Sequence, residues 1–266
     1  MKQKINLLAT LNKLIREIIN WLVNVWATSK NFYFPKKFTW RWKLEMLTDK
    51  YEPETTALFK RIIKPGMVII DIGAHIGYYT RLFSRLTGEG GQVLSFEPDP
   101  DNFGLLRKNT LNLKNIKLFN LAVSDQSGET NFYKVKNSTG CHSIIETDNA
   151  DKITVSAIKI DDFIKQKNLK IDAIKIDIEG GETKALSGMT EFFKNTSHLK
   201  LVTELSADSL KLAAIEPKKF LNQLHSHGFT LFEISDNGKT ALLAENKIIK
   251  EDGSLAEKSI NLLAIK

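Results

Sequence analysis

The sequence predicts an α/β protein built on an open, mostly parallel sheet with helices on both faces. The first observation is that β-branched runs of strand length alternate with stretches of helical periodicity from about residue 51 onward. The second is that the 266 residues are 42% hydrophobic and 26% charged, which is typical of a globular chain and sufficient for one large core. The third is that glycines and acids follow the strands, at the edge where such sheets bind ligands.

The alternation begins with a helix that Pro53 opens and Pro65-Gly66 ends. Later helices are expected from Tyr79 to Gly88, over 100–112, over 182–193, where apolar residues share one face, and from Pro217 to Gly228. Strands of the main sheet are expected at 67–74, 91–97, 115–123, 171–178, 199–205, 229–235 and 260–266, the last two as an antiparallel pair.

The alternation breaks once, after the third strand. Residues 129–135 and 152–160 have the pattern of two further strands, and the polar loop 136–151 lies between them. We therefore expect an extra β-hairpin inserted between the third and fourth strands of the core sheet.

Residues 1–27 form an amphipathic helix in this interpretation, because Leu11, Ile15, Ile18 and other apolar residues recur at helical spacing. The apolar stretch after Glu17 is too short to span a bilayer, and charges interrupt any secretory signal. Two alternatives remain open. The helix packs on its own domain or a dimer partner, or it lies in a membrane plane with Trp21 and Trp26 near the headgroups.

The domain boundary is expected at residue 50. Residues 1–50 would comprise the N-terminal helix and an aromatic-rich connector over 28–50, and residues 51–266 the α/β domain. Cys141 is the only cysteine, so the chain has no intrachain disulfide and no Cys-rich zinc site. We expect a cytoplasmic protein, with contact to the inner membrane face through residues 1–27 as the further alternative.

The net charge of +7 does not point to nucleic acid. Of the 38 basic residues 32 are Lys, whereas base readout and bidentate phosphate capture favour Arg. We therefore expect no nucleic acid among the partners of this protein.

The first strand ends in a D-x-G-x-x-x-G pattern formed by Asp71, Gly73 and Gly77. Gly73 permits a tight turn, and a ligand can lie against backbone amides there. The pattern differs from the G-x-G-x-x-G of dinucleotide sites. Glu97 ends the second strand, 20 residues after Gly77, where an acid is placed to accept both ribose hydroxyls of an adenosine. This carboxylate would repel a 2′-phosphate.

Five segments together carry a family resemblance: DIGAHIGYYT (71–80), SFEPDP (95–100), Asn109, LAVSD (121–125) and IKIDIEGGE (174–182). In this order and spacing they resemble the FkbM family of S-adenosylmethionine-dependent methyltransferases. The resemblance covers about residues 51–235. It implies a class I methyltransferase, Rossmann-like fold, with a seven-stranded, mostly parallel sheet and an antiparallel last strand, and S-adenosylmethionine as the cofactor.

The resemblance also implies which residues bind the cofactor. Asp71, Gly73 and Gly77, with Ala74 and His75 between them, would form the loop at the methionine end. Glu97 would hold the ribose. The adenine would rest on the residues after the third strand, Asn120, Leu121 and Ala122. The chain departs from the family pattern at His75, since many members have an Asn at this position.

Asp177 and Glu179 are the candidate catalytic residues. They are two apart after a buried strand, so they point to one side, and burying both unpaired would be costly. Lys175 could instead be their structural partner. A carboxylate within reach of an acceptor hydroxyl could remove its proton, and His142 in the polar loop is a weaker candidate for this step. Two carboxylates are a weak metal signal, so no metal is predicted.

The expected reaction is methyl transfer to a hydroxyl of a sugar, glycolipid or natural product, as the resemblance implies. Two alternatives remain at this point. An NAD-dependent Rossmann oxidoreductase would share the fold class and the ribose acid, and a non-catalytic membrane-surface module would need only the amphipathic helix.

Overall fold

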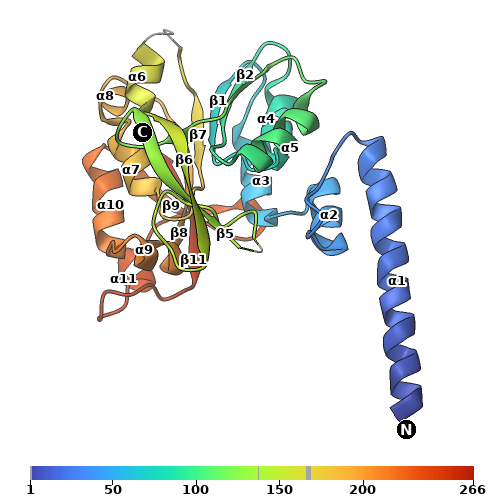
Figure 1. Ribbon diagram of the computed structural model, residues 1–266. Helices are drawn as coiled ribbons and strands as arrows, with labels where there is room; N and C mark the ends of the chain where they lie inside the picture. The colour runs from blue at the N-terminus through green and yellow to red at the C-terminus, as the bar shows by residue number, and fades with distance from the viewer. Residues whose placement is uncertain (1, 137, 166–168) are drawn as a thin grey trace.

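Figure 1 shows the computed structural model of the chain, which describes residues 2–136, 138–165 and 169–266, with side chains from residue 10 onward. Met1 of the expected N-terminal helix and Asn137 of the expected polar loop lie outside the described residues. Within these ranges the main sheet has eight strands in the order β10-β9-β11-β8-β7-β1-β2-β3. Their bounds are β1 Val68–Ile72, β2 Gln92–Phe96, β3 Ile116–Phe119, β7 Ala173–Ile176, β8 Lys200–Ser206, β9 Thr230–Ile234, β10 Thr240–Leu242 and β11 Ser259–Ile265.

The strand directions confirm the predicted sheet type. β3, β2, β1, β7 and β8 run parallel, and the last strand, β11, is antiparallel to both β8 and β9. The expected count of seven strands is wrong by one, because a short turn after β9 returns the chain as the edge strand β10. The chain moves outward from β1 to β3 and then restarts beside β1 with β7. The carboxyl ends of β1 and β7 therefore form the switch point where such sheets bind ligands.

A smaller sheet contains β4 (Ala122–Val123), β6 (Ala150–Ile158) and β5 (Gly128–Val135), in that order, with β5 and β6 antiparallel. The expected single strand over 115–123 is therefore wrong, because β3 and β4 belong to different sheets. Asn120 explains the break. Its side-chain amide donates to the carbonyls of Glu97 (2.7 Å) and Pro98 (3.0 Å), which turns the chain out of the main sheet.

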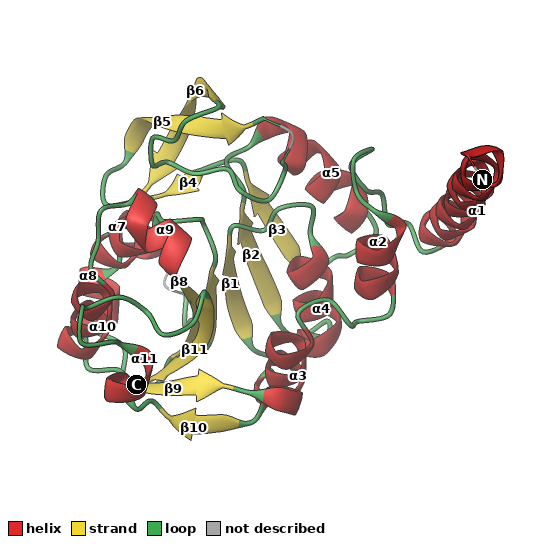
Figure 2. Cartoon of the chain, turned by 90° about the horizontal axis from the view of Figure 1, so that it is seen from below, coloured by secondary structure: helices red, strands yellow, loops and turns green. Residues whose placement is uncertain are grey.

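Helices cover both faces of the main sheet (Figure 2). One face carries α3 Pro53–Ile62, α4 Tyr78–Thr87 and α5 Pro100–Thr110. The other carries α7 Glu182–Ser187, α8 Thr190–Lys194 and α10 Pro217–Ser226, together with α6 Ile160–Lys165, which Figure 1 shows beside α7 and α8. Phe59 and Phe83 are fully buried on the first side, and Phe193 and Phe220 on the second. The shorter helices α9 Ala207–Leu212, η1 Asp236–Gly238 and α11 Glu245–Ile248 complete the domain.

The single helix expected over 182–193 is two helices, α7 and α8, which meet at Gly188. A Cβ at Gly188 would lie 2.1 Å from the carbonyl oxygen of Ser124. Close packing against the loop after β4 therefore fixes the position of this break, which an apolar stripe does not reveal.

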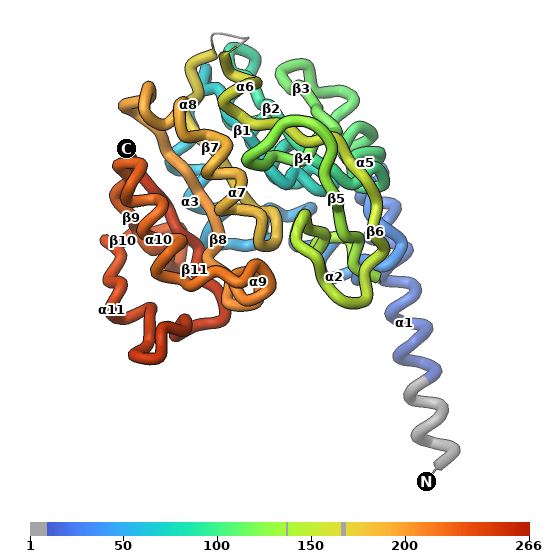
Figure 3. The backbone as a smooth tube through the Cα atoms, turned by 60° about the vertical axis from the view of Figure 1, so that its left-hand side comes forward, coloured from blue at the N-terminus to red at the C-terminus, as the bar shows by residue number. Residues whose placement is uncertain are grey.

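The N-terminal segment contains α1 (Lys2–Ser29) and α2 (Trp40–Leu47). Figures 1 and 3 show α1 standing apart from the sheet, with only its C-terminal end near the domain. Neither α1 nor any other helix in the described ranges combines the length and apolarity needed to cross a bilayer. The expected connector 28–50 includes the helix α2. The side chain of Thr39 caps this helix by accepting from the N–H of Trp42.

Asn109 joins the N-terminal segment to the domain. Its side chain is buried, accepts from the N–H of Tyr33 (2.7 Å) and donates to the carbonyls of Tyr33 (2.9 Å) and Ile76 (2.7 Å). One amide therefore holds the connector against the loop that follows β1.

Candidate active site

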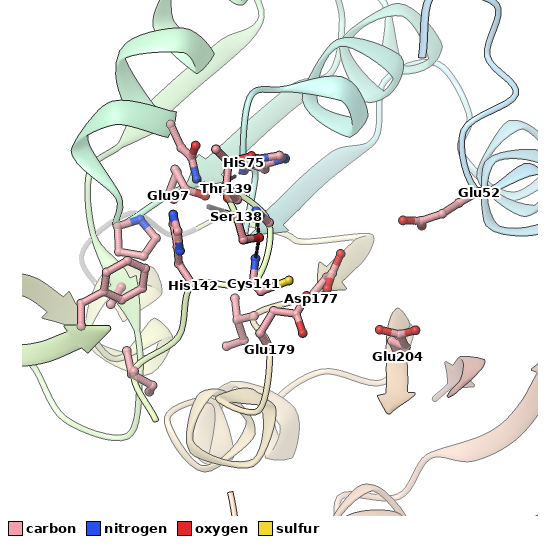
Figure 4. A pocket seen from close by; sticks show the side chains of 18 of the residues that line it. Glu52, His75, Glu97, Ser138, Thr139, Cys141, His142, Asp177, Glu179 and Glu204 are labelled. Atoms are coloured by element: carbon pink, nitrogen blue, oxygen red, sulfur yellow. Dashed lines mark hydrogen bonds between the residues drawn. The ribbon is translucent and has the colours of Figure 1, made fainter. Parts of the chain in front are cut away.

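A cavity of about 350 Å³ lies at the carboxyl ends of β1, β2 and β7 (Figure 4). Its size falls within the roughly 300–1,000 Å³ of small-molecule sites. Seven of the predicted site residues line it: Gly73, His75, Glu97, Ala122, His142, Asp177 and Glu179. The topology thus brings together residues that are up to 106 positions apart in the sequence.

Gly73 allows the ends of β1 and β7 to meet. Its φ is +78°, and a Cβ there would lie 1.9 Å from the carbonyl oxygen of Asp177. A side chain would therefore force the two strand ends apart. The N–H groups of Gly73 and Ala74 both donate to the carbonyl of Phe96 at 3.0 Å, so the loop is also tied to β2.

Glu97 is buried in the cavity wall and held by backbone groups. One carboxylate oxygen accepts from the N–H of His75 (2.8 Å), and the other accepts from the N–H of Asp99 (2.9 Å). Burial raises the pKa of Glu97 to about 7, although these hydrogen bonds oppose the rise. Its carboxylate is thus fixed in place while it still lines the cavity.

Residues 138–142 of the polar loop between β5 and β6 line the cavity, and two domain residues hold this part of the loop. The Nε2 atom of His75 lies 3.2 Å from the hydroxyl of Thr139, and the amide of Asn102 donates to the Thr139 carbonyl (2.8 Å). Burial lowers the pKa of His75 to about 4, so its ring is neutral at pH 7. Asn102 was not predicted. Its place in the first turn of α5, which Asp99 caps, is the sequence signal that could have indicated it.

His142 lines the cavity, but both of its ring nitrogens face the protein. Nδ1 accepts from the N–H of Val135 (3.0 Å), and Nε2 lies 3.8 Å from a carboxylate oxygen of Asp99. Lys134 pairs with the same Asp99 oxygen at 2.8 Å, and burial lowers the pKa of His142. These contacts favour a role in holding the loop over the weaker catalytic role that the sequence suggested.

Two further carboxylates join Asp177 and Glu179 in the cavity wall. Figure 4 shows Glu52 and Glu204, which sequence reasoning missed, on the same side as Asp177. Glu204 belongs to β8, so an acid near the end of a strand was the available signal. No similar signal marks Glu52, which precedes α3.

Asp177 and Glu179 have different surroundings. An oxygen of Asp177 lies 3.1 Å from the Nζ atom of Lys175, so the alternative partner is in contact, yet Asp177 still reaches the cavity. Glu179 has a left-handed backbone, with φ +53°, and accepts from the hydroxyl of Ser209 (3.2 Å). Burial and then the charges of Asp177 and Glu204 raise the pKa of Glu179 to about 7.

The lining is acidic, which restricts the ligand. Five carboxylates line the cavity, from Glu52, Glu97, Asp177, Glu179 and Glu204, and Lys37 is the only Lys or Arg among the described lining residues. A pyrophosphate would face these carboxylates, whereas a cationic ligand would be attracted. This arrangement counts against the nicotinamide-cofactor alternative. No group of three His, Cys, Asp or Glu in the described ranges is arranged to hold a metal ion.

Five predicted cofactor residues do not line the cavity: Asp71, Ala74, Gly77, Asn120 and Leu121. Asp71 is fully buried beneath the loop, accepts from the hydroxyl of Thr80 (2.6 Å) and is paired in register with Lys175. A Cβ at Gly77 would lie 2.8 Å from the Leu106 side chain, so this glycine serves the packing of α4 on α5. Asp71 and Gly77 thus contribute to the packing around the cavity and not to its lining.

The outer wall comes from the N-terminal segment, which sequence reasoning treated as a connector. Phe38, Trp42 and Met46 of this segment line the cavity, and so does Tyr51, which follows it directly. The density of aromatic residues between Phe32 and Trp42 was the signal that could have indicated this role. Apolar side chains and several carboxylates in one lining suit a ligand with both apolar and hydroxyl-bearing faces.

Comparison with known proteins agrees with this geometry. The model of the methyltransferase FkbM domain matches residues 71–231. The 2-O-methyltransferase NoeI of Sinorhizobium fredii (strain NBRC 101917 / NGR234) is 28% identical over 61% of this chain and 73% of its own. The 31-O-demethyl-FK506 methyltransferase FkbM of Streptomyces tacrolimicus is 27% identical over 48% and 62%, respectively. The hexuronic acid methyltransferase AglP of Haloferax volcanii is 25% identical over 49% and 53%.

The match covers more than half of the chain and includes the strand ends that form the cavity. It also agrees with the parallel core of the sheet and its antiparallel last strand. The chain belongs to the FkbM family of methyltransferases and is an enzyme that uses S-adenosylmethionine as its methyl donor.

Proposed function

We propose that the cavity binds S-adenosylmethionine with Glu97 at the ribose, Ala122 beside the adenine, and the Gly73–His75 loop at the methionine end. The acidic lining supports this assignment, because the donor carries a sulfonium and an ammonium group. The free oxygen lone pairs of Glu97 could accept from both ribose hydroxyls, since each carboxylate oxygen has one backbone donor. When bound, the cofactor supplies an electrophilic methyl group.

We further propose that Glu179 is the general base. An alcohol acceptor forms a bond from its oxygen to the methyl carbon while the carbon–sulfur bond breaks, and its proton must leave. A carboxyl whose pKa is about 7 is well matched to take that proton near neutral pH. Asp177, held by Lys175, would accept a hydrogen bond from the acceptor and orient it. The single observation that carries this assignment is that Glu97 and Glu179 line one cavity at the switch point.

We infer that the acceptor is a hydroxyl of a sugar, a glycolipid or another natural product. Two relatives are named as O-methyltransferases or as acting on an O-demethyl compound, and a third is named for a hexuronic acid. The aromatic wall formed by Trp42 and Tyr51 supports a sugar, because sugar rings present C–H faces beside their hydroxyls.

The test uses Glu179→Gln with Asp177→Asn as the matched variant. The probes are methyl glycosides of hexoses and hexuronic acids, and the readout is methylated product by mass spectrometry. We expect Glu179→Gln to lower kcat by roughly 10²- to 10⁴-fold and to remove a rate increase centred near pH 7, while calorimetric S-adenosylhomocysteine affinity is unchanged. Asp177→Asn should instead raise KM and keep a pH-dependent rate whose midpoint lies at lower pH, because the Asp177 charge contributes to the raised pKa of Glu179. If Glu179→Gln retains full turnover, Glu179 is excluded as the general base.

A further inference from the structure

Helix α1 presents a broad apolar surface to solvent. We define its outer face as the exposed residues Leu11, Leu14, Ile15, Ile18, Trp21, Leu22, Val25 and Trp26. At about 100° per residue this face covers roughly 140° of the helix circumference. Single exposed apolar residues are common, but eight on one face of one helix indicate a contact surface.

The helix docks on its own domain through the opposite, more polar side. Val23 and Ala27 are buried there, and the side-chain oxygens of Asn20 and Asn24 each accept from the Nζ atom of the buried Lys43 at 2.9 Å. Because a polar contact occupies this side, the outer face does not pack on the chain's own domain. The occupant of the outer face is therefore either a second copy of the chain or a membrane.

The net charge of the protein resides in the segment that carries this face. Residues 1–50 contain ten basic and three acidic residues, whereas residues 51–266 contain 28 of each. The whole excess of +7 therefore lies in the N-terminal segment, and the catalytic domain is neutral overall. A positive segment with an apolar face is attracted to anionic phospholipid.

Two features favour a bilayer over a second copy of the chain. The face is wider than the narrow two-position seam of a coiled coil. In addition, Trp21 and Trp26 lie at its two margins by helical spacing, where their rings would reach the headgroup level of a bilayer.

We propose that α1 lies in the plane of an anionic phospholipid surface, with its outer face toward the acyl chains. The cavity would then open next to that surface, because α2 packs against α1 and contributes Trp42 and Met46 to the cavity wall. The evidence for membrane binding comes from the N-terminal segment and does not depend on the proposed function. The consequence of membrane binding, which rests on the proposed function, is that the acceptor hydroxyl belongs to a lipid-linked molecule.

The experiment is co-sedimentation of the full chain with vesicles of phosphatidylcholine alone, and with vesicles that contain about one third phosphatidylglycerol. The anionic vesicles should bind the protein, and binding should weaken about 5-fold for each basic residue neutralised, as in Lys13→Gln/Arg16→Gln. Ile18→Ser/Leu22→Ser should lower partitioning on the order of 100-fold. The matched control is Leu111→Ser/Leu242→Ser, which removes two leucines that are more exposed than Ile18 and Leu22 but lie elsewhere, and it should leave partitioning unchanged.

Three results would overturn the proposal. The first is that the protein binds neutral and anionic vesicles equally well, or binds neither. The second is that Ile18→Ser/Leu22→Ser binds anionic vesicles as well as its control does. The third is that light scattering shows a dimer without lipid and that Ile18→Ser/Leu22→Ser dissociates this dimer. Calorimetry with S-adenosylhomocysteine on the same variants keeps the outcomes separate. A variant that loses vesicle binding but keeps its affinity for S-adenosylhomocysteine tests the role of α1 without testing the proposed function. If the parent chain has no affinity for S-adenosylhomocysteine, the proposed function is overturned.

Discussion

Gly73→Ala tests how closely β1 approaches β7 at the site. The φ of +78° costs an alanine about 1–2 kcal/mol. The new Cβ would also lie 1.9 Å from the Asp177 carbonyl oxygen, so the strand ends must separate by more than about 1 Å to reach ordinary contact. Overpacking of this kind costs about 1–3 kcal/mol. The expected loss in the free energy of unfolding is therefore about 2–5 kcal/mol.

Gly66→Ala is the matched control. Gly66 has φ +87°, but a Cβ there would meet nothing within 4 Å. The free energy of unfolding of this variant should fall by only about 1–2 kcal/mol, which is the conformational cost. Urea unfolding of both variants gives the difference, and calorimetric titration with S-adenosylhomocysteine should show weaker binding for Gly73→Ala only. Equal losses of stability together with equal affinities would refute the reasoning that close approach at Gly73 shapes the site.

Three further predictions concern the groups around the cavity. Lys175→Met leaves Asp71 and Asp177 without their buried cation and should cost about 3–5 kcal/mol in urea unfolding, with a smaller loss at acidic pH, where the carboxyls are protonated. The pKa of Glu97 is about 7 in the fold and about 4.3 when unfolded, so the native state binds more protons between these values. Stability of the ligand-free protein should therefore fall as pH rises from about 4.5 to 7, and Glu97→Gln should make this fall shallower in unfolding curves taken across the range. Asn109→Ala removes the bonds to Tyr33 and Ile76, should cost about 1–3 kcal/mol, and should speed limited proteolysis near residue 33, a change that an equally destabilising variant remote from the connector would not reproduce.

The sequence predicted those parts of the site that have local signals. Gly73 follows a buried strand in a pattern that requires a tight turn, and Glu97 ends the next strand, so their meeting follows from parallel topology. Asp177 and Glu179 follow a third strand by the same logic. All four line the cavity, although their roles toward cofactor and acceptor stay predictions.

The remaining parts depend on contacts between distant segments. Trp42 reaches the cavity because α1 and Asn109 hold the connector against the domain, and nothing in residues 28–50 alone indicates that position. The break between β3 and β4 arises because Asn120 bonds to the loop after β2, which an apolar run cannot show. The orientation of the His142 ring depends on its contacts with Val135 and Asp99. The residue type alone suggested a ring that is free to accept a proton from the acceptor, because it does not show these contacts.

The most direct test of the account is a crystal structure of the protein with S-adenosylhomocysteine. The account predicts that the adenosine lies in the cavity with its ribose hydroxyls within hydrogen-bond distance of the Glu97 carboxylate and its sulfur on the side of Asp177 and Glu179. An adenosine bound elsewhere, or a ribose that makes no contact with Glu97, would contradict it.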